Sequence, residues 1–406
     1  MASRTLFPLG AFAERQTPFY YYDLDVLRCT LNTLRTESQR QRIQVHYALK
    51  ANANPRILSE IRQAGLGVDC VSGGEIKAAL QAGFPASRVV FAGVGKADWE
   101  IKLALEAGIF CFNVESVPEL EVIDSLAGAM GQTARVALRV NPDVQADTHH
   151  YITTGLKENK FGIALEDLDR VVDRTEELAH VQLVGLHFHI GSQILEMNNF
   201  AGLCVRVNEI QERLARRKVL LEHINVGGGL GVDYHYPDEA SVPNFAEYLA
   251  NFRKMLRLRP DQTLHVEPGR SVVAQCGSLI SKVLYVKQGS LRQFAILDAG
   301  MTDLIRPALY QAYHKIENLS AAAQGLPATA QGASPAIQDL SPTLEKYDVV
   351  GPICESSDCF GRDVLLPHTQ RGDLVAIRSA GAYGEIMSSN YNLRRTPPSY
   401  FSDDLI

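Results

Sequence analysis

The chain has 406 residues, a net charge of −6 and a hydrophobic fraction of 46%, enough for two or three domains or for one large barrel with a smaller unit. An acidic balance without a long basic run argues against nucleic acid and anionic membranes as partners, and no apolar stretch is long enough to span a bilayer. The N-terminus lacks the apolar core of a signal peptide. Seven cysteines without a Cys-x-x-Cys pair predict reduced thiols in a cytoplasmic protein, not a disulfide framework or a zinc ribbon.

The N-terminal stretch TPFYYYDLDVL predicts a strand followed by a helix. Short apolar runs then alternate with amphipathic segments. The candidate strands are 43–49, 67–70, 88–93, 110–113, 134–140, 181–189, 222–226 and 263–267. Candidate helices at 54–65, 73–83 and 96–108 each end at Gly, as a left-handed C-terminal cap requires. Eight successive strand–helix units predict a parallel (β/α)8 TIM-like barrel. An open doubly wound sheet is the weaker alternative, because periodicity does not prove closure.

After Glu267 the helical periodicity is mostly lost. Apolar runs separated by turn residues follow, at 271–288, 294–300, 347–352, 363–369 and 373–381. They predict a C-terminal all-β, Greek-key-like domain. The expected division is a barrel over 25–268 and a β-domain formed by 1–24 plus 269–406.

Two connections are unusual. Residues 141–160 form a long polar loop between the fifth and sixth strands, and loops of that length in a barrel usually cover a site or an interface. Residues 319–343 are poor in charge and rich in Ala, Gln, Gly, Ser and Pro, so we predict a mobile insertion there.

In a parallel barrel, functional groups sit at the carboxyl ends of the strands. The first strand ends in Lys50, the fifth near Arg139 and the sixth in His187-Phe188-His189. The seventh ends in the glycine run 227–231, and the eighth in the sequence EPGR at 267–270. A lysine at the mouth of a barrel is suited to bind an aldehyde cofactor.

The glycine run predicts a phosphate site. Barrel phosphate sites tend to follow strands seven and eight, and glycine lets backbone N–H groups approach phosphate oxygens. Arg270 adds a charge-assisted contact, and Ser192 offers a hydroxyl. The glycine run alone would indicate only a tight turn; with Arg270 on the next loop, phosphate is favoured.

Glu267 ends an apolar strand, where a carboxylate is costly to bury unless it is paired. Its partner is either a nearby arginine or the N–H of a pyridinium ring. Together with Lys50 and the phosphate site, the pyridinium hypothesis predicts pyridoxal 5'-phosphate as cofactor.

His187 and His189 point to one side of their strand, a spacing that also suits a metal. A His-x-His metal-dependent barrel hydrolase is therefore the rival hypothesis. It is disfavoured because the last two strand ends supply glycines and Glu-Pro-Gly-Arg rather than further ligands, so no metal is predicted. We expect His189 to lie flat against the cofactor ring, with His187 as a core residue behind it.

The motifs YALKANAN, HFHIGSQ, GGGLG, EPGR, GPICESSD and GAYG occur here in the order seen in fold-type III pyridoxal-phosphate decarboxylases. The sequence resembles that family, in its compact branch, over nearly the whole chain. The resemblance implies a TIM-like barrel with a C-terminal β-domain, pyridoxal 5'-phosphate as cofactor, and a cytoplasmic homodimer with two shared active sites.

The resemblance also implies roles for individual residues. The implied catalytic residues are Lys50, His189, Glu267 and Cys354, the last as a proton donor to the opposite subunit's site. The implied cofactor-binding residues are Lys50, His189, Ser192, Gly228, Gly229, Glu267, Gly269, Arg270 and Tyr383. The implied substrate-binding residues are Arg270, Arg306, Tyr310, Glu355 and Tyr383.

The branch of this family that the sequence resembles most converts meso-2,6-diaminopimelate to L-lysine by decarboxylation, the last step of bacterial lysine synthesis. That substrate carries a second carboxylate and a second ammonium, which Arg306 and Glu355 would bind. A relative acting on ornithine, lysine or a carboxylated polyamine is the alternative, although an ornithine enzyme has no use for Arg306. Cys359 lies close to Cys354 in the sequence, and a disulfide between them would inactivate the enzyme.

Overall fold

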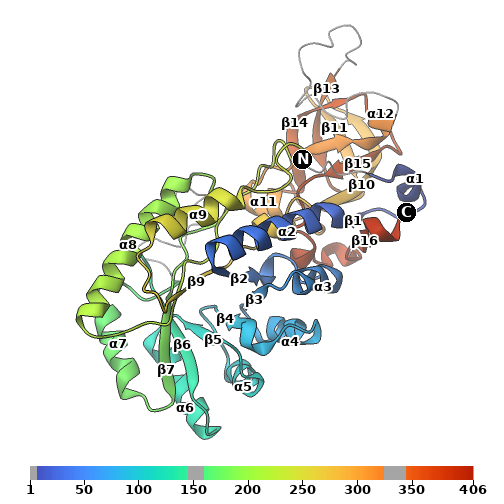
Figure 1. Ribbon diagram of the computed structural model, residues 1–406. Coiled ribbons are helices and arrows are strands. Elements are labelled where there is room, and N and C mark those ends of the chain that lie inside the picture. Colours follow the sequence, from blue (N-terminus) through green and yellow to red (C-terminus); the bar gives the residue numbers. More distant parts are fainter. Residues whose placement is uncertain (1–6, 145–159, 324–343, 406) are drawn as a thin grey trace. The chain divides into compact units, whose positions relative to one another are not determined.

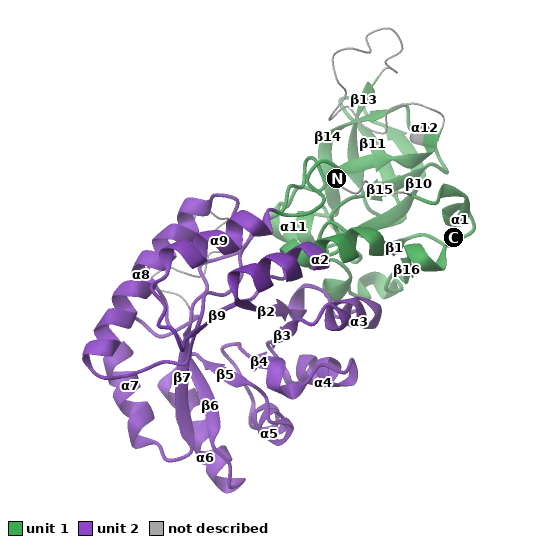
Figure 2. Cartoon of the chain, in the orientation of Figure 1, with its two compact units in different colours: residues 1–30, 232–243, 271–406 green, residues 31–231, 244–270 purple. Residues whose placement is uncertain are grey.

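The computed structural model describes residues 7–144, 160–323 and 344–405, and the chain forms two compact units (Figures 1 and 2). The barrel unit contains residues 31–231 and 244–270. The β unit contains residues 1–30, 232–243 and 271–406, so the short segment 232–243 clusters with the β unit although barrel segments flank it in sequence. In the described ranges, no helix has the length and apolar character needed to cross a bilayer.

The barrel unit is a closed, all-parallel barrel, which confirms the predicted fold class. Its last strand pairs with its first, with Val45 opposite Val266, and this pairing rules out the open sheet. The strands are β2 (Ile43–Ala48), β3 (Gly67–Cys70), β4 (Val89–Phe91), β5 (Cys111–Val114), β6 (Ala134–Arg139), β7 (Val181–His187), β8 (His223–Asn225) and β9 (Thr263–Val266).

Helices connect these strands, and local sequence signals set several of their ends. Ser72 accepts a hydrogen bond from the Glu75 N–H, and Ser116 caps α6 in the same way. Gly108 ends α5 with a left-handed φ of 65°. The helices are α2 (Leu24–Gln41), α3 (Pro55–Gln63), α4 (Gly73–Gln81), α5 (Asp98–Ala107), α6 (Val117–Ala129), α7 (Leu168–Glu177), α8 (Met197–Arg216) and α9 (Phe245–Met255).

The β unit is built around one long strand, β10 (Gly277–Gln288), which pairs with β1, β11 and β15. The sheet runs in the order β12-β15-β10-β11-β13-β14, and it is mostly antiparallel. Off this path, β1 pairs with β10, and β16 pairs with β1. The other strands are β1 (Phe19–Tyr22), β11 (Gln293–Leu297), β12 (Ile316–Asn318), β13 (Leu344–Val350), β14 (Cys359–Pro367), β15 (Leu374–Ile377) and β16 (Ser399–Phe401). The short helices are α1 (Leu9–Ala13), α10 (Arg270–Val273), α11 (Arg306–Tyr310) and α12 (Leu319–Ala323).

Two details differ from the sequence expectation. The run that begins at residue 271 starts as the helix α10, because a short apolar run does not distinguish a helical turn from a strand. The segment expected to be mobile begins with α12, whose Leu319 is buried; residues 324–343 lie outside the described residues, as does most of the 141–160 loop.

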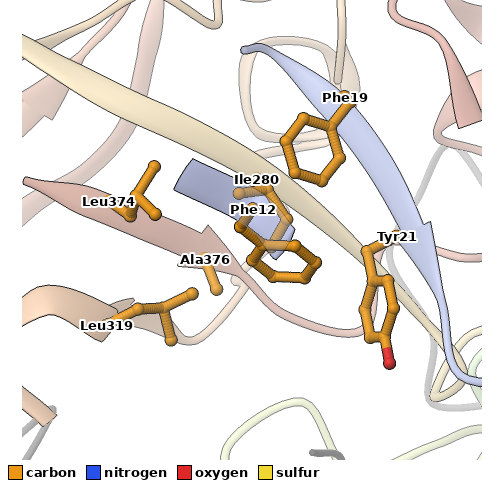
Figure 3. Close-up of a cluster of buried hydrophobic side chains, with 7 residues drawn as sticks. All are labelled: Phe12, Phe19, Tyr21, Ile280, Leu319, Leu374 and Ala376. Carbon is orange, nitrogen blue, oxygen red and sulfur yellow. The ribbon is translucent and has the colours of Figure 1, made fainter. Parts of the chain in front are cut away.

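The core of the β unit contains the buried cluster Phe12, Phe19, Tyr21, Ile280, Leu319, Leu374 and Ala376 (Figure 3). The rings of Phe12 and Phe19 meet edge to face with centroids 5.2 Å apart. Each fully buried side chain of this size stabilises the fold by about 1.5–3 kcal/mol. The cluster joins residues far apart in sequence, so the N-terminal segment is an integral part of this unit.

Three buried histidines form a layer on the adjacent strands β2, β9 and β8. His46 Nε2 lies 2.8 Å from His265 Nδ1, and the ring centroids of His223 and His265 are 4.8 Å apart. Glycines make room for two of the rings: a Cβ at Gly185 would lie 2.5 Å from His223 Nε2, and one at Gly67 would lie 2.7 Å from His46 Nδ1. Burial lowers the pKa of all three imidazoles, to about 3 for His223.

The histidine layer predicts that the barrel loses stability in mild acid. Because the folded pKa lies below the unfolded value, each imidazole stays neutral when folded, and its contribution is complete above about pH 6.5. Below that pH the unfolded chain takes up protons and stability falls, by about 1.4 kcal/mol per pH unit for His223, whose folded pKa is about 3. Between pH 6.5 and 5, we expect His223→Gln to reduce the dependence of the free energy of unfolding on pH by about 1.4 kcal/mol per pH unit.

Urea unfolding followed by the fluorescence of Trp99 measures this, because the single tryptophan of the chain lies on α5 of the barrel unit. The control is His235→Gln, an exposed position in the β unit, which should keep the wild-type slope. An unchanged slope in His223→Gln would contradict the prediction.

Candidate active site

Lys50 lies in a single helical turn, Leu49–Ala51, directly after β2. Its Nζ is 3.5 Å from Asp69 Oδ2 on the neighbouring strand β3, and its side chain is 41% exposed. Burial, reinforced by the negative charge of Glu267, raises the pKa of Asp69. Asp69 Oδ1 has no hydrogen-bond partner among the described residues. Sequence analysis missed Asp69; its signal is a lone acid inside the apolar strand GVDC.

Glu267 follows β9 and is buried, and side chains from three other strands converge on its carboxylate. Oε1 accepts hydrogen bonds from Asn225 Nδ2 at 2.6 Å and Asn113 Nδ2 at 3.3 Å. Oε2 lies 2.9 Å from His187 Nε2. Burial by itself would raise the pKa of Glu267, but the neighbouring His187 and Lys50 outweigh it, and the pKa is lowered. The carboxylate is therefore ionised at neutral pH. Both asparagines were missed in the sequence.

The glycine run bends back over the end of the barrel. A Cβ at Gly228 would lie 2.1 Å from the Glu267 carbonyl oxygen, and Gly229 has a φ of +113°. The Gly228 N–H donates to His189 Nδ1 at 3.3 Å, and burial lowers the pKa of His189, which keeps Nδ1 available as an acceptor. Only glycine fits this bend, and the bend brings the N–H of Gly228 into a hydrogen bond with His189.

Arg270 and Ser192 are brought together although 78 residues separate them. Arg270 donates to Ser192 Oγ from Nη2 at 3.1 Å and from Nε at 3.3 Å. Ser192 belongs to the HIGSQ segment, and the carbonyl oxygen of Gly229 accepts the N–H of Ile194, the residue that follows this segment. A guanidinium, a hydroxyl and a glycine bend therefore lie together, a donor set suited to phosphate.

Gly269 lies where the loop after the last barrel strand, β9, meets the turn after the first barrel strand, β2. Its ideal Cβ would lie 3.0 Å from Ala48 Cβ and 3.2 Å from Ala51 Cβ, and the Ala48 N–H donates to Pro268 O at 3.1 Å. The loop after β9 thus packs against the turn that carries Lys50. The amine, the buried carboxylate and the serine–arginine pair lie at one end of the same barrel.

The remaining predicted residues lie in the β unit. Arg306 begins α11 and is buried, while Tyr310 ends that helix half-buried. Tyr383 is half-buried and holds a left-handed φ of 57°. Cys354 and Glu355 are exposed between β13 and β14.

Two contacts hold the Cys354 loop. The Cys354 N–H donates to Asn392 Oδ1 at 3.3 Å, and Tyr391 donates from its hydroxyl to Glu355 Oε1 at 2.7 Å. Cys354 and Cys359 are both free thiols. The structure thus sorts the predicted residues into a barrel group and a β-unit group.

The barrel group fits pyridoxal 5'-phosphate. An accessible amine suits the aldehyde, and the Ser192–Arg270 pair beside the glycine bend suits the phosphate. A carboxylate has about four acceptor sites, and Glu267 uses three, which leaves one for a pyridinium N–H. For the rival hydrolase, the described parts contain no group of three His, Cys, Asp or Glu side chains arranged to bind a metal.

Comparison with known proteins agrees with this geometry. Residues 27–274 match the family model described as "Pyridoxal-dependent decarboxylase, pyridoxal binding domain", which defines the class of the protein. The diaminopimelate decarboxylase of Bacteroides thetaiotaomicron is 60% identical, with 99% of each chain covered. That of Pseudomonas aeruginosa is 43% identical, over 95% of this chain and 88% of its own. The chain belongs to the diaminopimelate decarboxylase family, which confirms the resemblance found in the sequence.

A solved structure supports the same assignment. The Helicobacter pylori diaminopimelate decarboxylase complexed with L-lysine superposes with a TM-score of 0.86 at 39% identity. The match covers 97% of this chain and 93% of that one. The fold similarity therefore extends over both units.

The glycine bend yields a prediction about cofactor affinity. Gly228→Ala places a Cβ against a backbone oxygen that cannot move without shifting Glu267, so we expect the affinity for pyridoxal 5'-phosphate to fall by about tenfold or more. Titrating the apo-protein with the cofactor and following visible absorbance measures this. Gly202→Ala on α8 is the control, because its Cβ makes only an ordinary 3.5 Å contact, with the side chain of Val144. Equal affinities in Gly228→Ala and wild type would show that the bend tolerates a side chain.

Proposed function

We propose that this chain is a pyridoxal 5'-phosphate-dependent carboxy-lyase that converts meso-2,6-diaminopimelate to L-lysine and carbon dioxide. The observation that carries the proposal is 60% identity, over essentially the whole of both chains, to a diaminopimelate decarboxylase. The convergence of Lys50, Glu267 and the Ser192–Arg270 pair at one end of the barrel supports it.

The barrel group would hold the cofactor. Lys50 would bind its aldehyde, and Ser192, Gly228, Gly229 and Arg270 its phosphate. His189 would pack against the ring, with Gly269 keeping the neighbouring turns close and Tyr383 contributing from the β unit. When bound, the cofactor supplies an electron-accepting ring that takes up the electron pair left behind by carbon dioxide.

Glu267 would face the ring nitrogen and keep it protonated. Its lowered pKa keeps it ionised over the physiological range, and Asn225, Asn113 and His187 hold it in place. A neutral group at this position would leave the nitrogen without an anionic partner and so weaken the electron sink. Lys50, with Asp69 beside it, would release the product amine.

The far end of the substrate carries a carboxylate and an ammonium. Arg306 would bind the carboxylate through its planar fork, and Glu355 would bind the ammonium, with Tyr310 beside Arg306 on α11. A diamino acid without the second carboxylate leaves the arginine without its ligand. This charge pair favours diaminopimelate over ornithine.

The thiol of Cys354 would return a proton to the carbon that has lost carbon dioxide. Because Cys354 and Glu355 are exposed on the β unit, we propose that they serve the barrel of a second copy of this chain, in a homodimer with shared sites. The free cysteines suit a reducing compartment, and we propose that the enzyme works in the cytoplasm.

The function is tested by incubating the purified protein with meso-diaminopimelate, with and without added cofactor, and measuring L-lysine and carbon dioxide. We expect equal amounts of both products, no activity in Lys50→Ala, and borohydride treatment that fixes the cofactor to Lys50. Ornithine should not be decarboxylated. Turnover of ornithine but not of diaminopimelate would overturn the substrate proposed here.

The proton-donor role predicts the behaviour of Cys354→Ala. General acid catalysis contributes about 10²–10⁴-fold, so we expect kcat to fall by about 10²-fold or more. The visible absorbance of the bound cofactor should not change, because the thiol is not part of the barrel group. Cys29→Ala, on α2, is the matched control and should retain wild-type kcat. Full activity in Cys354→Ala would show that another group donates the proton.

A further inference from the structure

The guanidinium of Arg306 is held by two neutral side chains of the β unit. Nη1 lies 2.9 Å from His314 Nε2 and 3.0 Å from the Tyr234 hydroxyl oxygen. The guanidinium carbon also lies 5.1 Å from the centroid of the Tyr234 ring, which meets the His314 ring edge to face. All three residues are buried. The orientation of Arg306 is therefore set by a ring acceptor and a hydroxyl acceptor.

The partners of His314 determine its tautomer. Nδ1 lies 2.8 Å from the backbone carbonyl oxygen of Arg378, and a carbonyl only accepts, so Nδ1 carries the hydrogen. Arginine N–H groups only donate, so Nε2 must present its lone pair to Arg306. His314 is thus a neutral imidazole that accepts from the guanidinium at Nε2 and donates to the backbone carbonyl oxygen of Arg378 from Nδ1.

Arg378 helps to hold both hydrogen-bond partners of Arg306, which are Tyr234 and His314. Its Nη1 is 2.6 Å from Glu317 Oε2, and its Nη2 is 2.6 Å from Asp238 Oδ1. Asp238 belongs to the segment 232–243, which also carries Tyr234. One buried arginine therefore holds the segment that presents Tyr234 and, through its carbonyl, the ring of His314.

We propose that His314 and Tyr234 are positioning residues that set the plane of Arg306 for the carboxylate at the far end of diaminopimelate. The proposal rests on the function proposed above. Bidentate binding needs the fork held in one plane, and two acceptors on Nη1 block rotation of the guanidinium. Because both acceptors are neutral, they orient the cation without adding a negative charge that would oppose the substrate carboxylate. Selectivity for a substrate with a second carboxylate thus depends on two residues outside the barrel.

Three variants separate positioning from general stability. His314→Leu removes the acceptor, whereas His314→Gln restores an acceptor oxygen close to the position of Nε2. Tyr234→Phe removes the hydroxyl and keeps the ring against Arg306. Tyr236→Phe is the matched control, because Tyr236 is exposed on the same segment.

Each variant is compared with wild-type holoenzyme in two measurements. The first is kcat and KM for meso-diaminopimelate. The second is a spectroscopic titration with L-lysine and, separately, with cadaverine, which differs from lysine only by lacking the carboxylate. A positioning defect acts on ligands that carry the carboxylate, whereas a loss of fold or cofactor weakens both.

We expect His314→Leu and Tyr234→Phe to raise KM and to weaken L-lysine binding by about tenfold or more, since each removes a hydrogen bond to a charged group. Cadaverine binding and kcat should stay close to wild type. His314→Gln should recover most of the loss, and Tyr236→Phe should match wild type throughout.

Equal weakening of lysine and cadaverine, or unchanged KM in both loss-of-acceptor variants, would overturn the proposal. If His314→Leu does not fold, Tyr234→Phe decides: a selective loss supports positioning and an unchanged KM refutes it. Wild-type protein that forms no lysine from diaminopimelate would overturn the proposed function and this inference together. Lysine formation with unaffected variants would overturn this inference alone.

Discussion

The barrel group is organised around one buried negative charge, the carboxylate of Glu267. A buried carboxylate is tolerated only with partners, and Asn113, Asn225 and His187 supply them from β5, β8 and the end of β7. Burial opposes the charge, but His187 and the nearby Lys50 lower the pKa of this carboxyl and keep it ionised. The contacts of Glu267 also fix the loop after β9, whose backbone lies against the glycine bend on one side and the Lys50 turn on the other. The partners that satisfy the buried charge of Glu267 therefore also fix the spacing of the amine, the carboxylate and the phosphate donors.

The β unit contains a similar arrangement around a buried positive charge. Arg378 is a buried cation satisfied by Glu317 and Asp238, and its backbone carbonyl sets the tautomer of His314. Hydrogen bonds to His314 and Tyr234 then orient the guanidinium of Arg306. In both units the side chain proposed to meet a ligand depends on a second set of buried polar residues for its orientation.

The sequence predicted the barrel because eight apolar runs and their capping residues are local signals that the tertiary structure preserves. It also located Lys50, Glu267 and Arg270, which stand out chemically at strand ends. It could not locate Asn113, Asn225, His314 or Tyr234. Neutral polar residues leave no local signal. The partners of Asn113, Asn225 and Tyr234 lie 42–154 residues away, and His314 is tied to Arg306, eight residues away, only by the tertiary fold. Asp69 did leave a signal, an acid in an apolar strand. The helix α10 was missed because a short apolar run fits either structure.

The histidine layer of the barrel restricts how this sequence can change. The rings of His223 and His46 occupy the space that side chains at Gly185 and Gly67 would need. The backbone at neither glycine has a positive φ, so neither position requires glycine for its conformation. Both positions require glycine because atoms of neighbouring segments fill the space that a side chain would occupy. A homologue that carries a side chain at position 185 must carry a smaller residue at position 223. A smaller residue at position 46 would not suffice for position 67, because a Cβ there would also lie 2.6 Å from the backbone carbonyl oxygen of Arg88.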